Sequence, residues 1–128
     1  MLKVTAFSDR IMEMRIIKEP ITREELKRIA QERYGDLVKA VVDVEQEIMA
    51  LGGEMHADEE VFLMENYGAQ RANTWWINLL PGRFGNDEFL VYDSMVNLKP
   101  SFGNRTRGVD DPTIRKRIQH IVRSLIIL

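Results

Sequence analysis

Residues 37–51, with the sequence LVKAVVDVEQEIMAL, are the part of the chain that decides its fold class. β-branched and other apolar residues fill both ends of this segment, Glu45-Gln46 interrupts them, and Gly52-Gly53 follows. This pattern predicts two strands that form a hairpin with its turn near Glu45-Gln46. Strands joined by so short a turn run antiparallel, which favours a mainly antiparallel sheet.

Helical patterns lie on both sides of this hairpin. Before it, residues 23–34 follow Thr22 and carry Glu25, which together form a capping box, and Gly35 comes after the last turn. After it, residues 57–66 begin with an acidic turn that suits the positive end of a helix dipole. We therefore expect a helix at each place.

A third helix is predicted in the C-terminal part of the sequence. Asp111 is a good N-cap, and Pro112 is favoured in a first helical turn. Apolar residues then recur at helical spacing on one side, and the opposite side is polar and basic. The apolar side consists of Ile114, Ile118, Ile121, Val122 and Leu125, and the polar side of Arg115, Lys116, Gln119 and Arg123.

Three further strands complete the expected fold, at residues 14–18, 74–80 and 88–98. The order is then β-α-β-β-α-β-β-α, in which hairpins outnumber strand–helix–strand crossovers. We expect a single α+β domain at residues 14–128, with a mixed or mainly antiparallel sheet and the helices packed on one face. Residues 1–13 are expected to be an N-terminal extension.

The composition is that of one globular domain without cysteine chemistry. The chain has 128 residues, of which 45% are hydrophobic and 30% charged, so it can bury a core. The absence of cysteine excludes disulfides, thiolate nucleophiles and zinc–sulfur sites. No apolar run approaches the ~20 residues that cross a bilayer, and the start lacks the apolar core of a signal peptide. We expect a cytoplasmic protein with no membrane partner and, because no P-loop or dinucleotide motif is present, no cofactor.

Charge is unevenly distributed along a chain whose formal net charge is −2. Residues 43–66 contain eight acidic residues and no lysine or arginine, whereas residues 99–128 contain seven basic and two acidic residues. The basic segment can form a surface for a polyanion such as nucleic acid. Alternatively, the two segments neutralise each other, within one molecule or across a homodimer.

Polar residues alternate in the strand predicted at 88–98 and just beyond it. Since side chains alternate across a sheet, Asp93, Asn97 and Lys99 share one face. Asn78 of the neighbouring strand can join them. A strand beside a core does not normally carry an acid, an amide and an amine on one face. The pattern indicates either a binding site or the solvated outer face of an antiparallel sheet.

A polar loop with the sequence PSFGNRTRG, residues 100–108, follows that strand. Its backbone amides, hydroxyls and two guanidiniums can hold a phosphate or a carboxylate. The candidate binding residues are Asn78, Asn97, Lys99, Ser101, Asn104, Arg105 and Arg107. Alternatively, Asp110 and Asp111 pair with the arginines and only fix the loop.

His56 is the candidate catalytic residue, because a histidine exchanges a proton near neutral pH. Asp93 is the candidate for orienting it. The alternative is that His56 caps or packs the helix predicted at 57–66. With Asp58 or Glu60, His56 matches no strong metal signature, so no metal site is expected.

Several blocks of the sequence occur together and in order in a known family. They are His56-Ala57-Asp58-Glu59-Glu60, Trp75 with Ile77-Asn78-Leu79, Asp93-Ser94-Met95 with Asn97, and Pro100-Ser101, Gly103-Asn104-Arg105 and Arg107-Gly108-Val109. Through them, the chain from about Met14 to Leu125 resembles a small uncharacterised bacterial protein family that is classed as a domain of unknown function. The resemblance implies no established activity and no catalytic residues. The chain departs from the family's pattern at Trp76, Lys99 and Phe102, where the resemblance implies a small residue, an arginine and a polar residue.

Three functional hypotheses follow. The first is a small binding or accessory domain with a site around residues 93–107 for an anion: a phosphate group, a nucleotide or nucleic acid. The second is a metal-independent hydrolase, for example a ribonuclease, in which His56 exchanges the proton and Lys99, Arg105 and Arg107 stabilise the phosphate charge. The third is a structural or regulatory protein that oligomerises, such as a toxin–antitoxin component. The site predictions assume that His56, the polar strand and the arginine loop converge in space.

Overall fold

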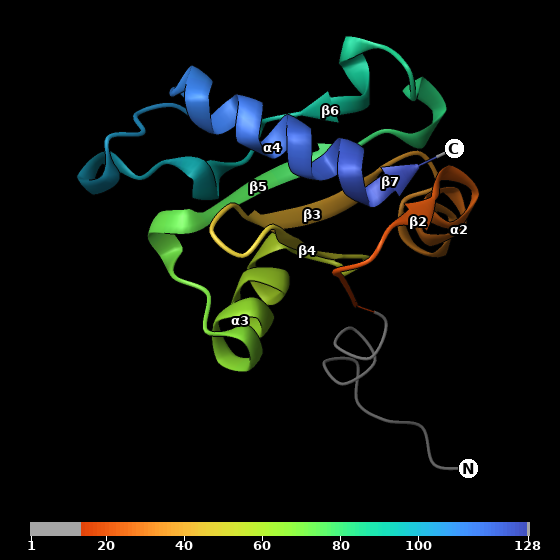
Figure 1. Cartoon of the computed structure of the whole chain (residues 1–128), viewed down its shortest axis with the longest axis horizontal. Coiled ribbons are helices and arrows are strands. Elements are labelled where there is room, and N and C mark those ends of the chain that lie inside the picture. The colour runs from red at the N-terminus through yellow and green to blue at the C-terminus, as the bar shows by residue number, and fades with distance from the viewer. Residues whose placement is uncertain (1–13, 128) are drawn as a thin grey trace.

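A five-stranded sheet forms the centre of the computed structural model, which describes residues 14–127 (Figure 1). Its strands are β1 (Arg15–Ile17), β3 (Val38–Asp43), β4 (Ile48–Leu51), β5 (Thr74–Leu79) and β6 (Leu90–Val91). They lie in the order β1-β4-β3-β5-β6, and each neighbouring pair is antiparallel. The predicted α+β class and the mainly antiparallel sheet are confirmed.

The hairpin predicted at residues 37–51 forms β3 and β4. Asp43 ends β3, and its carboxylate fixes the turn. Its Oδ1 accepts the backbone N–H groups of Glu45 and Gln46 at 2.9 and 3.2 Å. An aspartate suits this position because its short side chain reaches backbone amides a few residues further along the chain. The turn therefore forms where the sequence predicts it.

The three predicted helices are present as α2 (Arg23–Arg33), α3 (His56–Tyr67) and α4 (Pro112–Leu125). Thr22 caps α2 by accepting the backbone N–H of Glu25 at 3.1 Å. Asp111 caps α4 by accepting the backbone N–H of Thr113 at 2.8 Å. α3 ends at Gly68, whose φ of 67° is a left-handed conformation that favours glycine.

The helices cover both faces of the sheet, which corrects the expectation that they pack on one face. On the first face, Val42 of β3 and Ile77 of β5 pack with residues of α2 and α4 in the main core. On the second face, Val41 and Trp76 pack with Leu63 of α3 in a smaller core. The two central strands carry apolar residues on both sides, so each side needs a helix to cover it.

The prediction of a strand at residues 88–98 is wrong for most of this range. Within it, only β6 (Leu90–Val91) is a strand, and β6 pairs with the last two residues of β5. Two short 3₁₀ helices follow it, Met95–Asn97 and Pro100–Phe102.

A local hydrogen bond accounts for this change of structure. The hydroxyl of Ser94 accepts the backbone N–H of Val96 at 3.3 Å, which starts the first 3₁₀ helix. Serine side chains compete in this way with the pairing of strands. Because the chain turns here, the alternation of side chains that placed Asp93, Asn97 and Lys99 on one face does not apply.

A two-stranded parallel sheet joins the two ends of the described region. β2 (Ile21–Thr22) precedes α2, β7 (Ile126–Ile127) follows α4, and Ile21 pairs with Ile126. The predicted extension at residues 1–13 lies outside the described residues. Within residues 14–127, every helix is too short or too polar to cross a membrane.

Candidate functional site

Asn97 is buried and completes the hydrogen bonding of β5. Its Oδ1 accepts the backbone N–H of Trp76 at 3.0 Å, and its Nδ2 donates to the carbonyl oxygen of Trp76 at 2.9 Å. Nδ2 also donates to the carbonyl oxygen of Arg107 at 3.1 Å. A carboxamide can replace a neighbouring strand in this way because it carries both a donor and an acceptor. Since Asn97 is 0% exposed, it does not face a ligand.

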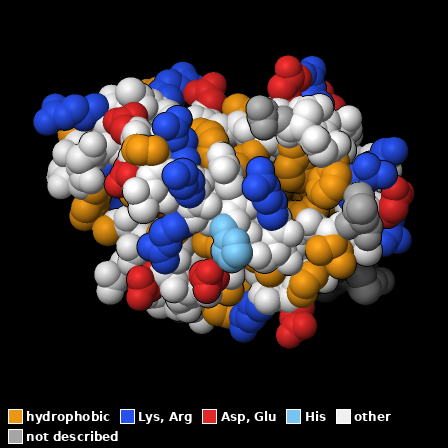
Figure 2. All heavy atoms as spheres, turned by 45° about the horizontal axis from the view of Figure 1, so that its top comes forward, with side chains coloured by type: hydrophobic (Ala, Val, Ile, Leu, Met, Phe, Trp, Pro, Cys, Tyr) orange, Lys and Arg blue, Asp and Glu red, His pale blue; other side chains and the backbone are white. Residues whose placement is uncertain are grey.

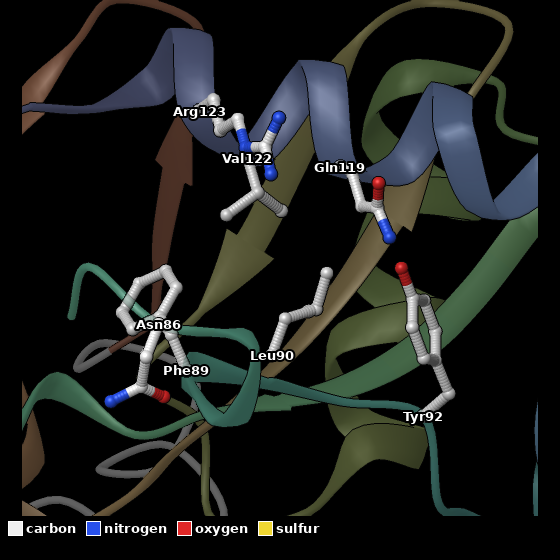
Figure 3. Close-up of a pocket in the computed structure, with 7 residues that line it drawn as sticks. All are labelled: Asn86, Phe89, Leu90, Tyr92, Gln119, Val122 and Arg123. Atoms are coloured by element: carbon white, nitrogen blue, oxygen red, sulfur yellow. The ribbon is translucent and has the colours of Figure 1, made fainter. Parts of the chain in front are cut away.

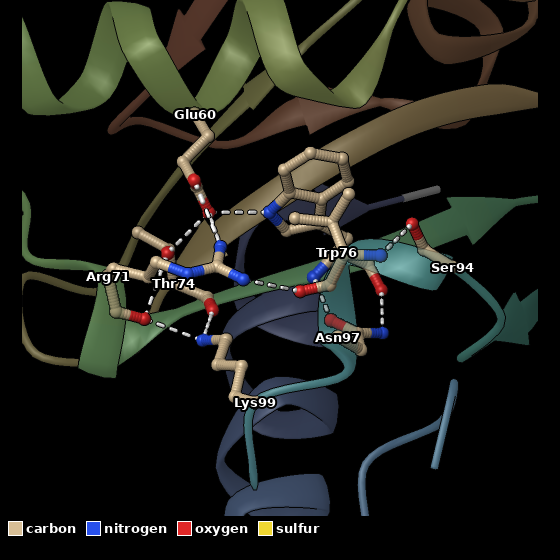
Figure 4. Close-up of polar contacts among 8 residues, drawn as sticks. Glu60, Arg71, Thr74, Trp76, Ser94, Asn97 and Lys99 are labelled. Carbon is tan, nitrogen blue, oxygen red and sulfur yellow. Dashed lines mark hydrogen bonds and ion pairs between the residues drawn. The ribbon is translucent and has the colours of Figure 1, made fainter. Parts of the chain in front are cut away.

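Lys99 is also internal, with 2% of its surface exposed. Its Nζ donates to the carbonyl oxygens of Arg71, at 2.5 Å, and of Thr74 (Figure 4), and lies 3.9 Å from the centre of the Trp75 ring. The pKa of Lys99 is lowered from 10.5 to about 8, mainly by burial and also by the charge of Arg71, against the opposing charge of Glu60. The ammonium group of Lys99 therefore binds the backbone beside β5 rather than an external anion.

Glu60 of α3 connects the helix to the same part of β5 (Figure 4). Its Oε2 accepts the hydroxyl of Thr74 at 2.9 Å and the indole N–H of Trp76 at 2.7 Å. The guanidinium of Arg71 pairs with this carboxylate at 3.2 Å and donates to the carbonyl oxygen of Val96 at 3.1 Å. We call the connected set the inner network; its members are Glu60, Arg71, Thr74, Trp76, Asn97 and Lys99.

Asn104 folds the predicted binding loop onto itself. Its Nδ2 donates to the carbonyl oxygens of Asn97, Thr106 and Gly108 at 2.8, 3.1 and 2.7 Å. Its Oδ1 accepts the backbone N–H of Asp110 at 2.7 Å. Because the side chain is buried and these bonds occupy it, Asn104 shapes the loop and does not face a ligand.

The other predicted site residues reach the surface; they are Asn78, Asp93, Ser101, Arg105 and Arg107. The Arg107 guanidinium pairs with the Asp93 carboxylate at 2.8 Å, and Asn78 donates to the carbonyl oxygen of Asp93 at 3.3 Å. The backbone N–H of Arg105 donates to the carboxylate of Asp110 at 2.7 Å. The guanidinium of Arg105 has no partner among the side chains that the structure describes, so it is the predicted cation that stays available.

His56, the predicted catalytic residue, is buried between α3 and the sheet. Its Nε2 donates to the carbonyl oxygen of Ile77 at 2.8 Å, and its ring centre lies 5.1 Å from that of Trp76. The pKa of His56 is lowered from 6.5 to about 4, mainly by burial; the hydrogen bond to Ile77 opposes the shift, and the charge of Lys39 contributes to it. No hydrogen bond or ion pair joins His56 to Asp93 in the described region. The structure does not bring the predicted pair together.

Glu59 is a fully buried acid on the inner side of α3, although the sequence places it among the acids of a first helical turn. Its Oε2 accepts the backbone N–H of Gly53 at 2.9 Å. Burial raises the pKa of Glu59 well above 4.5, against the effect of that hydrogen bond. A side chain at Gly53 would begin 3.0 Å from the Cγ atoms of Glu59 and Met14, which explains the glycine. Glu59 belongs to the packing of α3.

A groove that the sequence does not predict runs beside α4 (Figure 3). Its helical wall consists of Gln119, Val122 and Arg123, and its other wall of Asn86, Phe89, Leu90 and Tyr92. This cavity measures about 140 Å³. An adjoining cavity of about 290 Å³ shares four of these residues and extends to Phe84, Gly85 and Ile126. We call the two cavities together the α4 groove.

The α4 groove combines aromatic surface with positive charge. The rings of Phe84 and Phe89 meet edge to face, with centres 5.0 Å apart. Burial raises the pKa of Tyr92, whose hydroxyl donates to the carbonyl oxygen of Arg115 at 3.3 Å. Arg123 is exposed, and its guanidinium pairs with none of the side chains that the structure describes.

Basic side chains gather on the outer side of α4, on the face that Figure 2 shows. The helix contains no acidic residue, and Arg115, Lys116 and Arg123 are exposed. A shallower hollow continues from Tyr92 to Arg115 and to the loop at residues 106–110. The basic C-terminal segment therefore forms a surface along α4 that adjoins the loop bearing Arg105.

A comparison with protein families covers almost the whole described region, from β1 to the end of α4. The model of a family described as "Protein of unknown function (DUF5674)" matches residues 15–125. The chain belongs to this family. Searches of curated proteins and of solved structures found no match. The predicted resemblance to an uncharacterised family is confirmed. Because membership in DUF5674 assigns no activity, the function of this member has to be argued from its geometry.

Proposed function

We propose that this DUF5674 protein is a binding domain for a phosphate-bearing ligand with an aromatic base, a nucleotide or a short nucleic-acid strand. The base lies in the α4 groove against Phe89 and Tyr92, and the phosphate lies beside Arg123. The observation that carries the proposal is the guanidinium of Arg123, which lines the groove and pairs with no described side chain.

The chemistry of the groove suits such a ligand. A guanidinium presents N–H groups in a plane and binds phosphate oxygens in pairs. Aromatic side chains stack on any base, because every base has a flat face. Arg115 lies eight residues before Arg123 on α4, which is about 12 Å along the helix axis. Arg115 therefore offers a second contact for a ligand with more than one phosphate.

The anion site expected at residues 93–107 moves to α4 in this proposal. Asn97, Lys99 and Asn104 bind backbone groups inside the protein. Arg107 is paired with Asp93. Arg105 lies next to Thr106, which lines the hollow beside Arg115. Arg105 itself is not among the residues that line this hollow, so the proposal assigns it no contact with the ligand.

The hydrolase hypothesis has no comparable support. With a pKa of about 4, His56 is neutral at pH 7, and its Nε2 is held by the carbonyl oxygen of Ile77. A general base needs a free nitrogen within reach of a substrate. The carboxylate of Asp93 faces Arg107 rather than the histidine.

Fluorescence anisotropy with a labelled single-stranded oligouridylate tests the proposal. We expect binding at roughly 50 mM salt that weakens steeply towards 200 mM, because phosphate contacts release bound counterions. Arg123→Glu should weaken binding at least about 10-fold. Uridine 5′-monophosphate should compete better than ribose 5-phosphate, which lacks the base.

Lys18→Glu is the matched control, because it reverses an exposed cation whose ammonium lies 4.6 Å from the centre of the Tyr67 ring of α3. It should bind like the wild type. No binding at low salt, or an equal loss in the two variants, would overturn the proposal. Urea unfolding of Arg123→Glu should match the wild type, which separates a lost contact from a lost fold.

A further inference from the structure

The α4 groove continues past Tyr92, because this residue lines both the groove and the shallower hollow beside Arg115. The Tyr92 hydroxyl hydrogen-bonds with the Gln119 side chain and donates to the carbonyl oxygen of Arg115. In Figure 3, Arg123 lies at one end of the groove, and Gln119 and Tyr92 lie together at the other end. The groove and the hollow therefore follow one another along α4 and form one path for an extended ligand.

Two arginines lie along this path. Arg123 lines the groove and Arg115 lines the hollow, and neither guanidinium pairs with a side chain that the structure describes. The distance between their positions on the helix is about 12 Å along its axis. A stacked nucleic-acid strand advances about 3.4 Å per nucleotide, so the two arginines match phosphates about three or four nucleotides apart. The phosphate of a single nucleotide is too small to contact both arginines.

Asp110 is the acidic residue that lines the hollow. Its carboxylate accepts the hydroxyl of Thr106 and, at 2.7 Å, the backbone N–H of Arg105. These hydrogen bonds lower the pKa of Asp110, so the group is negatively charged at neutral pH. The side chain is exposed, and each carboxylate oxygen can accept a second hydrogen bond. A carboxylate repels phosphate but accepts hydroxyl groups, so this wall of the hollow suits a ribose.

We propose that the ligand is a single strand of RNA of at least about three nucleotides, which follows α4 from Arg123 to Arg115 and places a ribose hydroxyl against Asp110. This inference rests on the proposed function and extends it from one nucleotide to a strand. The strand is unpaired, because Phe89 and Tyr92 are half-buried in the groove and only an unpaired base reaches the faces of their rings. The 2′-hydroxyl is the group through which a protein distinguishes RNA from DNA.

Competition against the labelled oligouridylate tests this inference with the full chain. The unlabelled competitors are uridine 5′-monophosphate, uridine 5′-triphosphate, tetrauridylate and tetradeoxyuridylate. We expect tetrauridylate to bind at least about 10-fold more tightly than either mononucleotide, because it contacts both arginines. It should bind about 5-fold more tightly than tetradeoxyuridylate, which lacks the hydroxyl for Asp110. Arg115→Glu should weaken the binding of tetrauridylate and leave that of uridine 5′-monophosphate unchanged, and Asp110→Asn should reduce the difference between RNA and DNA.

Lys18→Glu is again the matched control, because it reverses an exposed cation that lines neither the groove nor the hollow. It should leave every comparison as in the wild type, and urea unfolding checks that each variant is folded. If a mononucleotide bound as tightly as tetrauridylate, or DNA as tightly as RNA, this inference would be wrong while nucleotide binding would stand. If the labelled oligouridylate did not bind at all, the proposed function would fail as well.

Discussion

Lys99 and Arg123 belong to the same basic segment of the sequence, yet they lie in opposite environments. Lys99 is enclosed in the inner network and binds the carbonyl oxygens of Arg71 and Thr74. Arg123 is exposed at the α4 groove without a described partner. Each contributes one positive charge to the basic segment of the sequence, so the sequence alone does not distinguish them. The comparison shows that a basic segment becomes a candidate anion surface only where its cations are left unused by the fold.

The largest effect is expected for Asn97→Ala in the inner network. The change removes three hydrogen bonds and leaves the backbone N–H and carbonyl of Trp76 buried without a partner. We expect the free energy of unfolding to fall by about 3 kcal/mol. Urea denaturation measures it. Arg105→Ala, at an exposed position, should change this free energy by less than about 0.5 kcal/mol. If the two variants lost similar free energies of unfolding, the distinction between buried network residues and exposed basic residues would be wrong.

Lys99→Met should have a smaller effect that depends on pH. At pH 7 we expect a loss of about 1–2 kcal/mol, because two carbonyl oxygens lose their donor. The pKa of Lys99 is about 8 in the folded protein and 10.5 ordinarily, so the unfolded chain holds more protons between these values. The stability of the wild type therefore rises with pH in this range relative to the variant. Urea denaturation at pH 7, 8 and 9.5 should show that the difference in free energy of unfolding between the wild type and Lys99→Met widens with pH. A constant difference would refute the burial of the charged ammonium group of Lys99.

The smallest effect on stability is expected for Arg123→Ala. Its side chain is exposed, so the free energy of unfolding should stay within about 0.5 kcal/mol of the wild type. The same variant should lose affinity for the oligouridylate. Parallel urea and anisotropy measurements sharpen the comparison, because Lys99→Met should alter stability and Arg123→Ala only binding. A destabilisation of Arg123→Ala equal to that of Lys99→Met would show that Arg123 is structural.

The elements with local signals were predictable from the sequence. Thr22 and Asp111 cap helices through backbone groups a few residues away, and Asp43 fixes its turn in the same way. It was less evident from the sequence that helices cover both faces of the sheet. Val41 and Val42 are adjacent and point to opposite sides of β3, so their common apolar character was a sign that both faces are buried.

The candidate functional surface and the inner network were harder to predict, because their parts are distant in the sequence. Asn97 pairs with the backbone of Trp76, and no spacing in the chain indicates that contact. The α4 groove joins the segment at 84–92 to residues 119–126 of the C-terminal region. The helical pattern did place Gln119 and Arg123 on the polar side of α4. It contained no information about which segment would face them.

The pairing of β2 with β7 affects the order in which the chain acquires its structure. Ile21 and Ile126 come from opposite ends of the described region, and bringing them together closes a very long loop. Closing such a loop lowers chain entropy before the contact adds any stability, whereas the β3–β4 hairpin closes a short one. The hairpin is therefore suited to nucleate folding, and the small parallel sheet is suited to form late, once α2 and α4 are docked.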